Sequence, residues 1–289
     1  MPRAQCNGIE IEFDTFGSSD DPALLLIMGF SAQMTAWEEG FCRRLADEGF
    51  HVIRFDNRDV GLSSRITGGP EPDIAKAMSG DPSSAAYTLD DMADDAAGLL
   101  DALGIDTAHI VGASMGGMIA QLVACRHPEK TLSLCSIMST TGDPSVGQPQ
   151  PEAIAALLAP RPTTREEAVE RGGEVGRIIG SPVHFDEAKA RQRAGEAFDR
   201  ANDPDGVARQ LVAIMASADR TPALGNVNVP TLVIHGAADP LVTPSGGEAT
   251  AKAVPGADLL VLEEMGHDLP EPLWPGIVDA IVTNARRAS

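Results

Sequence analysis

A serine, an aspartate and a histidine stand in this chain where nucleophilic catalysis would need them. The serine, Ser114, lies at the centre of Gly112-Ala-Ser-Met-Gly116, which fits the pattern Gly-x-Ser-x-Gly. An apolar run, His109–Ala113, precedes it, and a helix-like pattern, Met115–Cys125, follows it. A serine that merely lies between glycines in a loop would need neither a strand before it nor a helix after it. The pattern therefore predicts a tight strand-to-helix turn that projects the serine hydroxyl above a sheet.

A serine hydroxyl is a weak nucleophile, so this chemistry also needs a base and an acid that orients the base. Asp239 follows the strand-like run Pro230–His235, and His267 follows the run Ala257–Leu262. The order Ser, Asp, His along the chain is the one expected for this type of turn. We predict that Ser114 is the nucleophile, His267 the general base and Asp239 the orienting acid.

Other acidic residues are weaker candidates for the acid that orients His267. Asp143 follows the predicted strand that ends near Met138, and it is the alternative acid, ranked below Asp239. Asp56 and Asp59 also follow a strand, but that strand lies upstream of the serine. We interpret them, together with Arg58, as a turn network that braces the site.

The remaining histidines suit structural positions better than catalysis. His51 and His109 open predicted strands, where we expect partial exposure. His127 precedes a proline at a helix end, where a cation is favourable. His184 lies in a helical segment, and His235 ends the strand before the predicted acid.

Two backbone N–H groups are candidates for holding a negatively charged reaction intermediate. The Met115 N–H lies at the start of the helix after the serine, where the helix carries partial positive charge. Phe30, in the loop after the run Ala23–Met28, is the second candidate. Losing one such donor typically costs about 2.7–4 kcal/mol in the transition state. This chemistry requires neither a metal nor an organic cofactor, so we expect none.

The elements that must position these residues alternate along the chain. Runs that predict strands lie at Ile9–Phe13, Ala23–Met28, His51–Phe55, His109–Ala113, Thr131–Met138, Pro230–His235 and Ala257–Leu262. Helical patterns stand between them, among them Trp37–Glu48 and a helix capped by Thr88 and ended by Gly104. This alternation predicts an α/β fold with a mostly parallel sheet and helices on both faces.

The alternation breaks between Gly142 and Pro222. Strand-like runs disappear there, and four helical patterns occupy Glu152–Leu158, Arg165–Ile179, Asp186–Ala201 and Gly206–Ser217. We therefore predict a core domain made of residues 1–141 and 222–289, interrupted by a helical cap of residues 142–221.

The composition of the chain limits the kinds of partner that we expect it to bind. The chain has 289 residues, of which 43% are hydrophobic and 22% charged, as in ordinary globular proteins. A net charge of −20 disfavours nucleic acid and anionic membranes as partners. Because no apolar run approaches the roughly 20 residues of a membrane span, and no secretory signal is visible, we expect a cytoplasmic protein without stable membrane insertion.

Segments that carry these residues resemble the α/β-hydrolase superfamily over nearly the whole chain. The matching segments are Leu25–Phe30, Asp56–Ser63, Gly112–Gly117, His235–Pro240 and Met265–His267. Within the superfamily the chain is similar to the bacterial carboxylesterase and lipase branch that includes the aclacinomycin methylesterase, which shares Met-Gly, here Met28-Gly29, in place of the common His-Gly. The resemblance implies an eight-stranded core, a helical cap, a Ser114–Asp239–His267 triad, and Phe30 and Met115 as oxyanion donors.

The resemblance also implies hydrolysis of a carboxylic ester through an acyl-enzyme intermediate. We expect a small-molecule ester substrate that is neutral and partly apolar. Alternatives on the same triad are a cofactor-free perhydrolase or haloperoxidase, and a carbon–carbon bond hydrolase, for whose acidic diketones Arg177, Arg191 and Arg193 are candidate contacts. A receptor-type hydrolase fold that binds a ligand is the alternative that is not an enzyme. Oligomeric state stays open.

Overall fold

The computed structural model describes residues 2–288. Eight strands form one sheet in the order β1-β2-β4-β3-β5-β6-β7-β8. The strands are β1 (Arg3–Cys6), β2 (Ile9–Phe16), β3 (Ala23–Ile27), β4 (His51–Phe55), β5 (Ala108–Ala113), β6 (Thr131–Ile137), β7 (Thr231–Gly236) and β8 (Asp258–Leu262). The β1–β2 and β2–β4 pairs are antiparallel, and every pair from β4 to β8 is parallel. The predicted mostly parallel sheet is confirmed.

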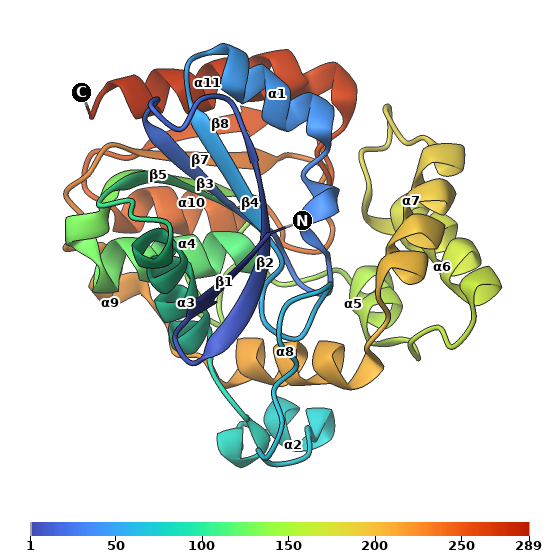
Figure 1. The fold of residues 1–289 in the computed structure, drawn as a ribbon. Helices are drawn as coiled ribbons and strands as arrows, with labels where there is room; N and C mark the ends of the chain where they lie inside the picture. The colour runs from blue at the N-terminus through green and yellow to red at the C-terminus, as the bar shows by residue number, and fades with distance from the viewer. Residues whose placement is uncertain (1, 289) are drawn as a thin grey trace.

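Helices cover both faces of this sheet (Figure 1). They are α1 (Glu39–Asp47), α2 (Ile74–Met78), α3 (Leu89–Ala102), α4 (Met115–Arg126), α5 (Pro151–Leu158), α6 (Arg165–Ile179), α7 (Glu187–Arg200), α8 (Pro204–Ala216), α9 (Thr221–Leu224), α10 (Ser245–Ala253) and α11 (Trp274–Arg286). α1 and α11 lie side by side on one face, and α3 and α4 pack together on the other.

The buried strand β3 shows why the sequence forms this layered core. All five of its residues are buried. Leu25 and Ile27 belong to the apolar cluster under α3 and α4, whereas Leu24 and Leu26 belong to the cluster under α1 and α11. A strand covered by helices on both faces reads as a continuous apolar run, which is the pattern seen here.

Helix boundaries follow capping chemistry. At the start of α3, Thr88 and Asp91 form a reciprocal capping box, as the sequence predicts. The prediction that a helix begins at Trp37 is wrong, because α1 begins at Glu39. Trp37 instead ends a single 3₁₀ turn in an extended conformation, and its ring stacks on Phe41 in the core.

The predicted partial exposure holds for His51 and fails for His109. His51 begins β4 and is partly exposed. His109 is only 4% exposed, because β5 lies in the middle of the sheet. Its Nδ1 lies 2.9 Å from the Ser133 hydroxyl, and its ring packs edge-on against Phe50. Burial lowers the pKa of His109 to about 4.

Five helices, α5 to α9, lie between β6 and β7, and we call the first four of them, α5 to α8, the cap helices. In Figure 1, α5, α6 and α7 lie to the right of the sheet, and α8 runs below them. α6 and α7 pack closely, because a Cβ added at Gly172 would come within 2.4 Å of the Ala194 side chain. Among the described residues, no helix is both long and apolar enough to cross a bilayer. The division into core and cap domains stays a prediction.

Candidate active site

Ser114 occupies a strained turn between β5 and α4. Its backbone has φ 57° and ψ −123°, a conformation that costs about 1–3 kcal/mol for a residue with a side chain. A Cβ at Gly112 would lie 2.0 Å from the Gly116 carbonyl oxygen, and one at Gly116 would lie 2.1 Å from the Ile27 carbonyl oxygen. The turn therefore needs both glycines, as the pattern predicts. The Ser139 hydroxyl holds it by donating to the Ser114 carbonyl at 2.9 Å.

The structure brings the predicted serine, histidine and aspartate together. His267 Nε2 lies 2.9 Å from Ser114 Oγ, although the two residues are 153 positions apart in the chain. His267 Nδ1 lies 2.7 Å from Asp239 Oδ2. A neutral imidazole with its proton on Nδ1 would leave Nε2 free to accept the serine proton.

Asp239 is held by its own loop at the end of β7. Its side chain is buried, and Oδ1 accepts hydrogen bonds from the backbone N–H groups of Leu241, at 2.8 Å, and Val242, at 2.9 Å. These bonds stabilise the ionised carboxylate and fix its direction, so that Oδ2 is left for His267.

The loop after β3 passes directly against the serine. A Cβ at Gly29 would come within 3.0 Å of the Ser114 Cβ, so no larger residue fits at that position without displacement. Among residues 2–288 the Phe30 N–H has no hydrogen-bond acceptor. The Met115 N–H at the first position of α4 has no partner within its helix. Both predicted oxyanion donors thus border Ser114.

Asp56 and Asp59 hold the surrounding loops, as the predicted turn network requires. Asp56 is fully buried, and its carboxylate accepts from the Met34 N–H at 2.7 Å and lies 2.8 Å from the Arg200 guanidinium of α7. Asp59 pairs with Arg209 of α8 at 2.8 Å. These ion pairs connect the loops after β3 and β4 to the cap helices.

Arg58, the third residue of the predicted network, directs its side chain away from the cap helices. The Arg58 side chain pairs with Asp95 of α3 at 2.6 Å, and only its backbone carbonyl reaches the cap, by accepting from Gln210 at 2.8 Å. The other side-chain end of Gln210 accepts from the Ser31 N–H at 3.0 Å. Gln210, which the sequence reasoning missed, therefore links the loops after β3 and β4 to each other and to α8.

The alternative acid does not reach the site. Asp143 accepts both the backbone N–H and the hydroxyl of Ser145, and these bonds hold its pKa below the usual range. No contact between Asp143 and His267 exists among the described residues. His235 is buried beside Asp239, and its Nε2 bonds to the Val242 carbonyl at 2.8 Å, so its position is structural.

The two remaining histidines are also bound elsewhere. His127 Nε2 lies 2.8 Å from Asp94, and His184 Nε2 lies 2.8 Å from Glu264. Neither distance involves Ser114 or Asp239.

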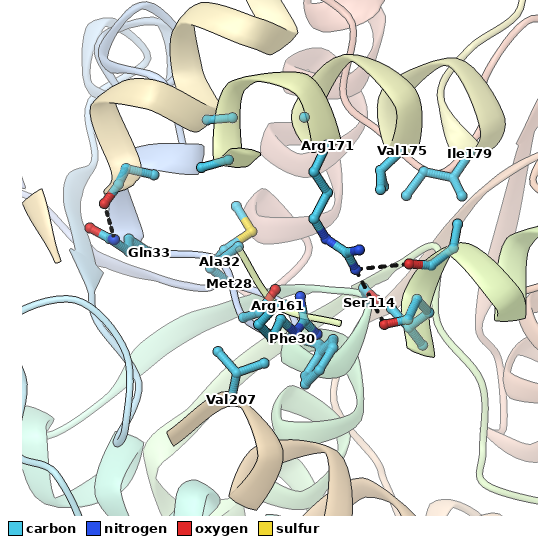
Figure 2. A pocket seen from close by; sticks show the side chains of 18 of the residues that line it. Met28, Phe30, Ala32, Gln33, Ser114, Arg161, Arg171, Val175, Ile179 and Val207 are labelled. Atoms are coloured by element: carbon cyan, nitrogen blue, oxygen red, sulfur yellow. Dashed lines mark hydrogen bonds between the residues drawn. The ribbon is translucent and has the colours of Figure 1, made fainter. Parts of the chain in front are cut away.

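A cavity of about 410 Å³ opens onto Ser114 (Figure 2), and His267 also lines it. Its walls come from the loop after β3 and from the cap helices, and they are mainly apolar, with Met28, Val175 and Phe198 among the lining residues. Arg161 and Arg171 also line it, and the sequence reasoning missed both. Arg161 sits in the short loop between α5 and α6, where no periodic pattern shows which way a side chain points.

The three arginines predicted as possible cap contacts do not line this cavity. Arg177 pairs with Glu187 at 2.5 Å, and Arg191 pairs with Glu170 at 2.7 Å, both on the exposed surface of the cap helices. Arg193 pairs with Glu38 and borders a second cavity of about 610 Å³, which lies on another side of His267.

A cluster of hydrogen bonds joins the end of α6 to the loop that carries His267. The His267 N–H donates to the Ile179 carbonyl at 2.6 Å. The Ser181 N–H donates to Asp268 at 3.0 Å, and the Ser181 hydroxyl donates to Asp268 and accepts from the Gly266 N–H at 2.9 Å. The sequence reasoning missed Ser181 and Asp268, because they are 87 positions apart and carry no shared motif.

The strand order, the strained serine turn and the bonded Ser–His–Asp set define an α/β hydrolase. Residues 22–271 match the family model described as the alpha/beta hydrolase fold, and the chain belongs to that family. Over its whole length and that of the relative, it is 32% identical to the rhodomycin D methylesterase of Streptomyces sp. strain C5. The expected likeness to the bacterial carboxylesterase and lipase branch that includes the aclacinomycin methylesterase is confirmed.

Solved structures agree with this fold. A thermophilic esterase from Thermogutta terrifontis superimposes with a TM-score of 0.75 at 25% identity, covering 100% of this chain and 99% of the other. A meta-cleavage product hydrolase from Pseudomonas fluorescens IP01 superimposes with a TM-score of 0.78 at 20% identity, covering 100% and 98%. The second likeness concerns the fold alone.

Proposed function

We propose that this protein is a serine hydrolase that cleaves a carboxylic ester of a small molecule, with a small alcohol such as methanol as leaving group. The observation that carries the proposal is the pair of His267 contacts, 2.9 Å to Ser114 and 2.7 Å to Asp239, beside a mainly apolar cavity that Ser114 and His267 both line. The full-length likeness to a rhodomycin D methylesterase supports the choice of a methyl ester.

In the proposed reaction, Ser114 Oγ attacks the ester carbonyl carbon while His267 Nε2 takes its proton. The Phe30 and Met115 N–H groups stabilise the oxyanion that forms. His267 then returns the proton to the alcohol oxygen, the carbon–oxygen bond breaks, and an acyl-serine remains. Water, deprotonated by His267, then attacks the acyl carbon, the bond from that carbon to Ser114 Oγ breaks, and His267 returns the proton to Oγ as the acid is released. Asp239 keeps the imidazole oriented and stabilises its protonated form.

The carbon–carbon hydrolase alternative finds no support in the arginines named for it, because all three are engaged in ion pairs with glutamates. Perhydrolase chemistry would use the same three residues, so an assay must separate it from ester hydrolysis. Parallel incubations with peroxide and a short carboxylic acid, and with a 2-hydroxy-6-oxodienoate, make that comparison.

The test is turnover of p-nitrophenyl esters from acetate to palmitate, and of the corresponding methyl esters. Wild type is compared with Ser114→Ala and with Ser145→Ala, which removes a serine hydroxyl at an exposed turn. We expect turnover that Ser114→Ala abolishes and Ser145→Ala retains. If no ester is hydrolysed in a Ser114-dependent manner, the proposal is wrong, and a ligand-binding protein of the same fold becomes the better interpretation.

A further inference from the structure

The cavity above Ser114 carries positive charge in a strongly acidic chain. The sequence has 42 acidic and 22 basic side chains, yet no aspartate or glutamate lines this cavity. Arg161 and Arg171 do line it, and both belong to the segment of cap helices that closes over the serine. The local charge is therefore opposite to that of the protein as a whole.

The two arginines differ in how they are held. Arg171 reaches from α6 to the end of α5, where it donates to the carbonyl oxygens of Ala156, at 2.8 Å, and Leu157, at 3.5 Å (Figure 2). It thereby occupies backbone acceptors that the last turn of α5 leaves open. Arg171 is a fixed structural cation.

Arg161 has no such anchor. Its guanidinium lies 4.9 Å from the centre of the Phe30 ring, and Figure 2 shows the two side chains next to each other in the cavity. No carboxylate pairs with Arg161 among residues 2–288. Apart from Arg171, the arginines of the cap helices each pair with an acid, namely Arg165, Arg177, Arg191, Arg193, Arg200 and Arg209.

The environment of Arg161 makes an unpaired charge unfavourable. Burial, and then repulsion by Arg171, lower the pKa of Arg161 to about 10. A guanidinium on an aromatic face keeps its N–H edge available for an acceptor in its own plane. An anion in the cavity would relieve the repulsion and satisfy those donors.

Resting on the proposed function, we infer that Arg161 binds a carboxylate carried by the substrate, so that the preferred substrates are half esters of dicarboxylic acids. The guanidinium fork matches a planar carboxylate with two parallel hydrogen bonds. A phosphate dianion would need further donors, and both terminal nitrogens of Arg171 already donate to backbone carbonyl oxygens, Nη1 to Pro160 and Nη2 to Ala156 and Leu157. Because Phe30 also supplies the proposed oxyanion N–H, the carboxylate would bind beside the reacting ester. This departs from the expectation of a neutral substrate.

The first test compares kcat/KM for monomethyl esters of the dicarboxylic acids from succinate to sebacate with kcat/KM for methyl alkanoates of matching length. For at least one length we expect wild type to favour the half ester by about 10- to 100-fold, as a charge-assisted hydrogen-bonded pair would give. Arg161→Met should bring that ratio close to one, and Arg161→Lys should retain part of it. Arg177→Met, which removes an exposed, paired arginine of the same helical segment, should keep the wild-type ratio.

A second measurement keeps the inference separate from the esterase proposal. Calorimetry measures the affinity of Ser114→Ala protein for the same half esters and alkanoates, with and without Arg161→Met. Tighter binding of half esters that depends on Arg161 supports the carboxylate site even if no ester is turned over. Ser114-dependent turnover without preference for any half ester, or a preference that survives Arg161→Met, overturns the carboxylate site and leaves the esterase proposal standing.

Discussion

The backbone N–H of His267 donates to the carbonyl oxygen of Ile179 at 2.6 Å, which ties the proposed general base to the last residue of a cap helix. The neighbouring backbones are so close that a Cβ at Gly266 would lie 2.5 Å from the Gly180 carbonyl oxygen. The direction of the imidazole therefore depends on where the end of α6 sits. The cap helices do more than close the cavity, because they help to place the proposed base.

Removing the Ser181 hydroxyl should weaken that tie. Ser181→Ala leaves the Gly266 N–H without its acceptor and Asp268 without one of its donors, next to His267. We expect kcat to fall about tenfold, with a smaller change in KM and a melting temperature lowered by a few degrees, since each of the two lost hydrogen bonds contributes about 1 kcal/mol. Ser145→Ala, which breaks a serine–aspartate pair at an exposed turn, is the matched control. An unchanged kcat for Ser181→Ala would show that the tie does not position the base.

The assignment of the acid can be tested by a pair of isosteric substitutions. Asp239→Asn should lower kcat by about 10⁴-fold, because an amide no longer selects the imidazole tautomer that accepts the serine proton. Asp143→Asn should change kcat by less than about twofold, because Asp143 bonds to Ser145 and not to His267. Steady-state kinetics on one p-nitrophenyl ester measures kcat for both variants. A large loss in Asp143→Asn and a small one in Asp239→Asn would identify Asp143 as the acid.

The serine turn should tolerate no side chain at its first glycine. In Gly112→Ala the new Cβ would lie 2.0 Å from the Gly116 carbonyl oxygen, so the turn must shift. We expect a loss of about 1–3 kcal/mol in the free energy of unfolding, measured in urea, together with loss of turnover. Gly276→Ala in α11 is the control, because its Cβ meets no heavy atom of the described residues within 4 Å and should stabilise the helix by about 0.5–1 kcal/mol. Equal effects of the two substitutions would contradict this packing.

The buried His109 should make stability depend on pH. Its pKa is about 4 in the folded chain against 6.5 for an exposed imidazole, so below pH 6.5 the unfolded chain takes up a proton that the folded chain does not. The contribution of His109 to the free energy of unfolding is therefore fully present above pH 6.5 and decreases as the pH drops toward 4. At pH 5 the free energy of unfolding has decreased by about 2 kcal/mol through this group.

The His109→Gln variant isolates this contribution. Its free energy of unfolding should lose about 2 kcal/mol less than that of wild type between pH 7.5 and pH 5, because glutamine does not titrate. Urea unfolding at several pH values measures the difference. A gap between the two proteins that stays constant with pH would show that His109 titrates normally.

Local patterns sufficed to predict the serine turn and most of the sheet. The pattern that predicts the turn at Ser114 spans only five positions. Buried strands such as β3 are recognisable in the sequence as apolar runs. The four-residue strand β1 and the five-residue helix α2 escaped prediction, because they are too short to show a period. The burial of His109 also escaped, since it depends on the place of β5 within the sheet rather than on the start of the strand.

The features that local patterns could not predict are contacts between distant segments. Ser181 meets Asp268 across 87 positions, and Arg161 meets Phe30 from a loop without periodicity. Neither pair has a motif, because what joins them is the docking of the cap helices on the sheet. The same reason applies to Arg177 and Arg191, whose partners Glu187 and Glu170 come into reach only when α6 and α7 pack together.

The most direct test of the proposed reaction is the mass of the intact protein after brief mixing with p-nitrophenyl acetate and quenching in acid. We expect wild type to gain the mass of one acetyl group, located by peptide mapping on Ser114, before steady-state release of acetate begins. Ser114→Ala should gain none. Ester hydrolysis without an acyl adduct on Ser114, or an adduct on another residue, would contradict nucleophilic catalysis by Ser114.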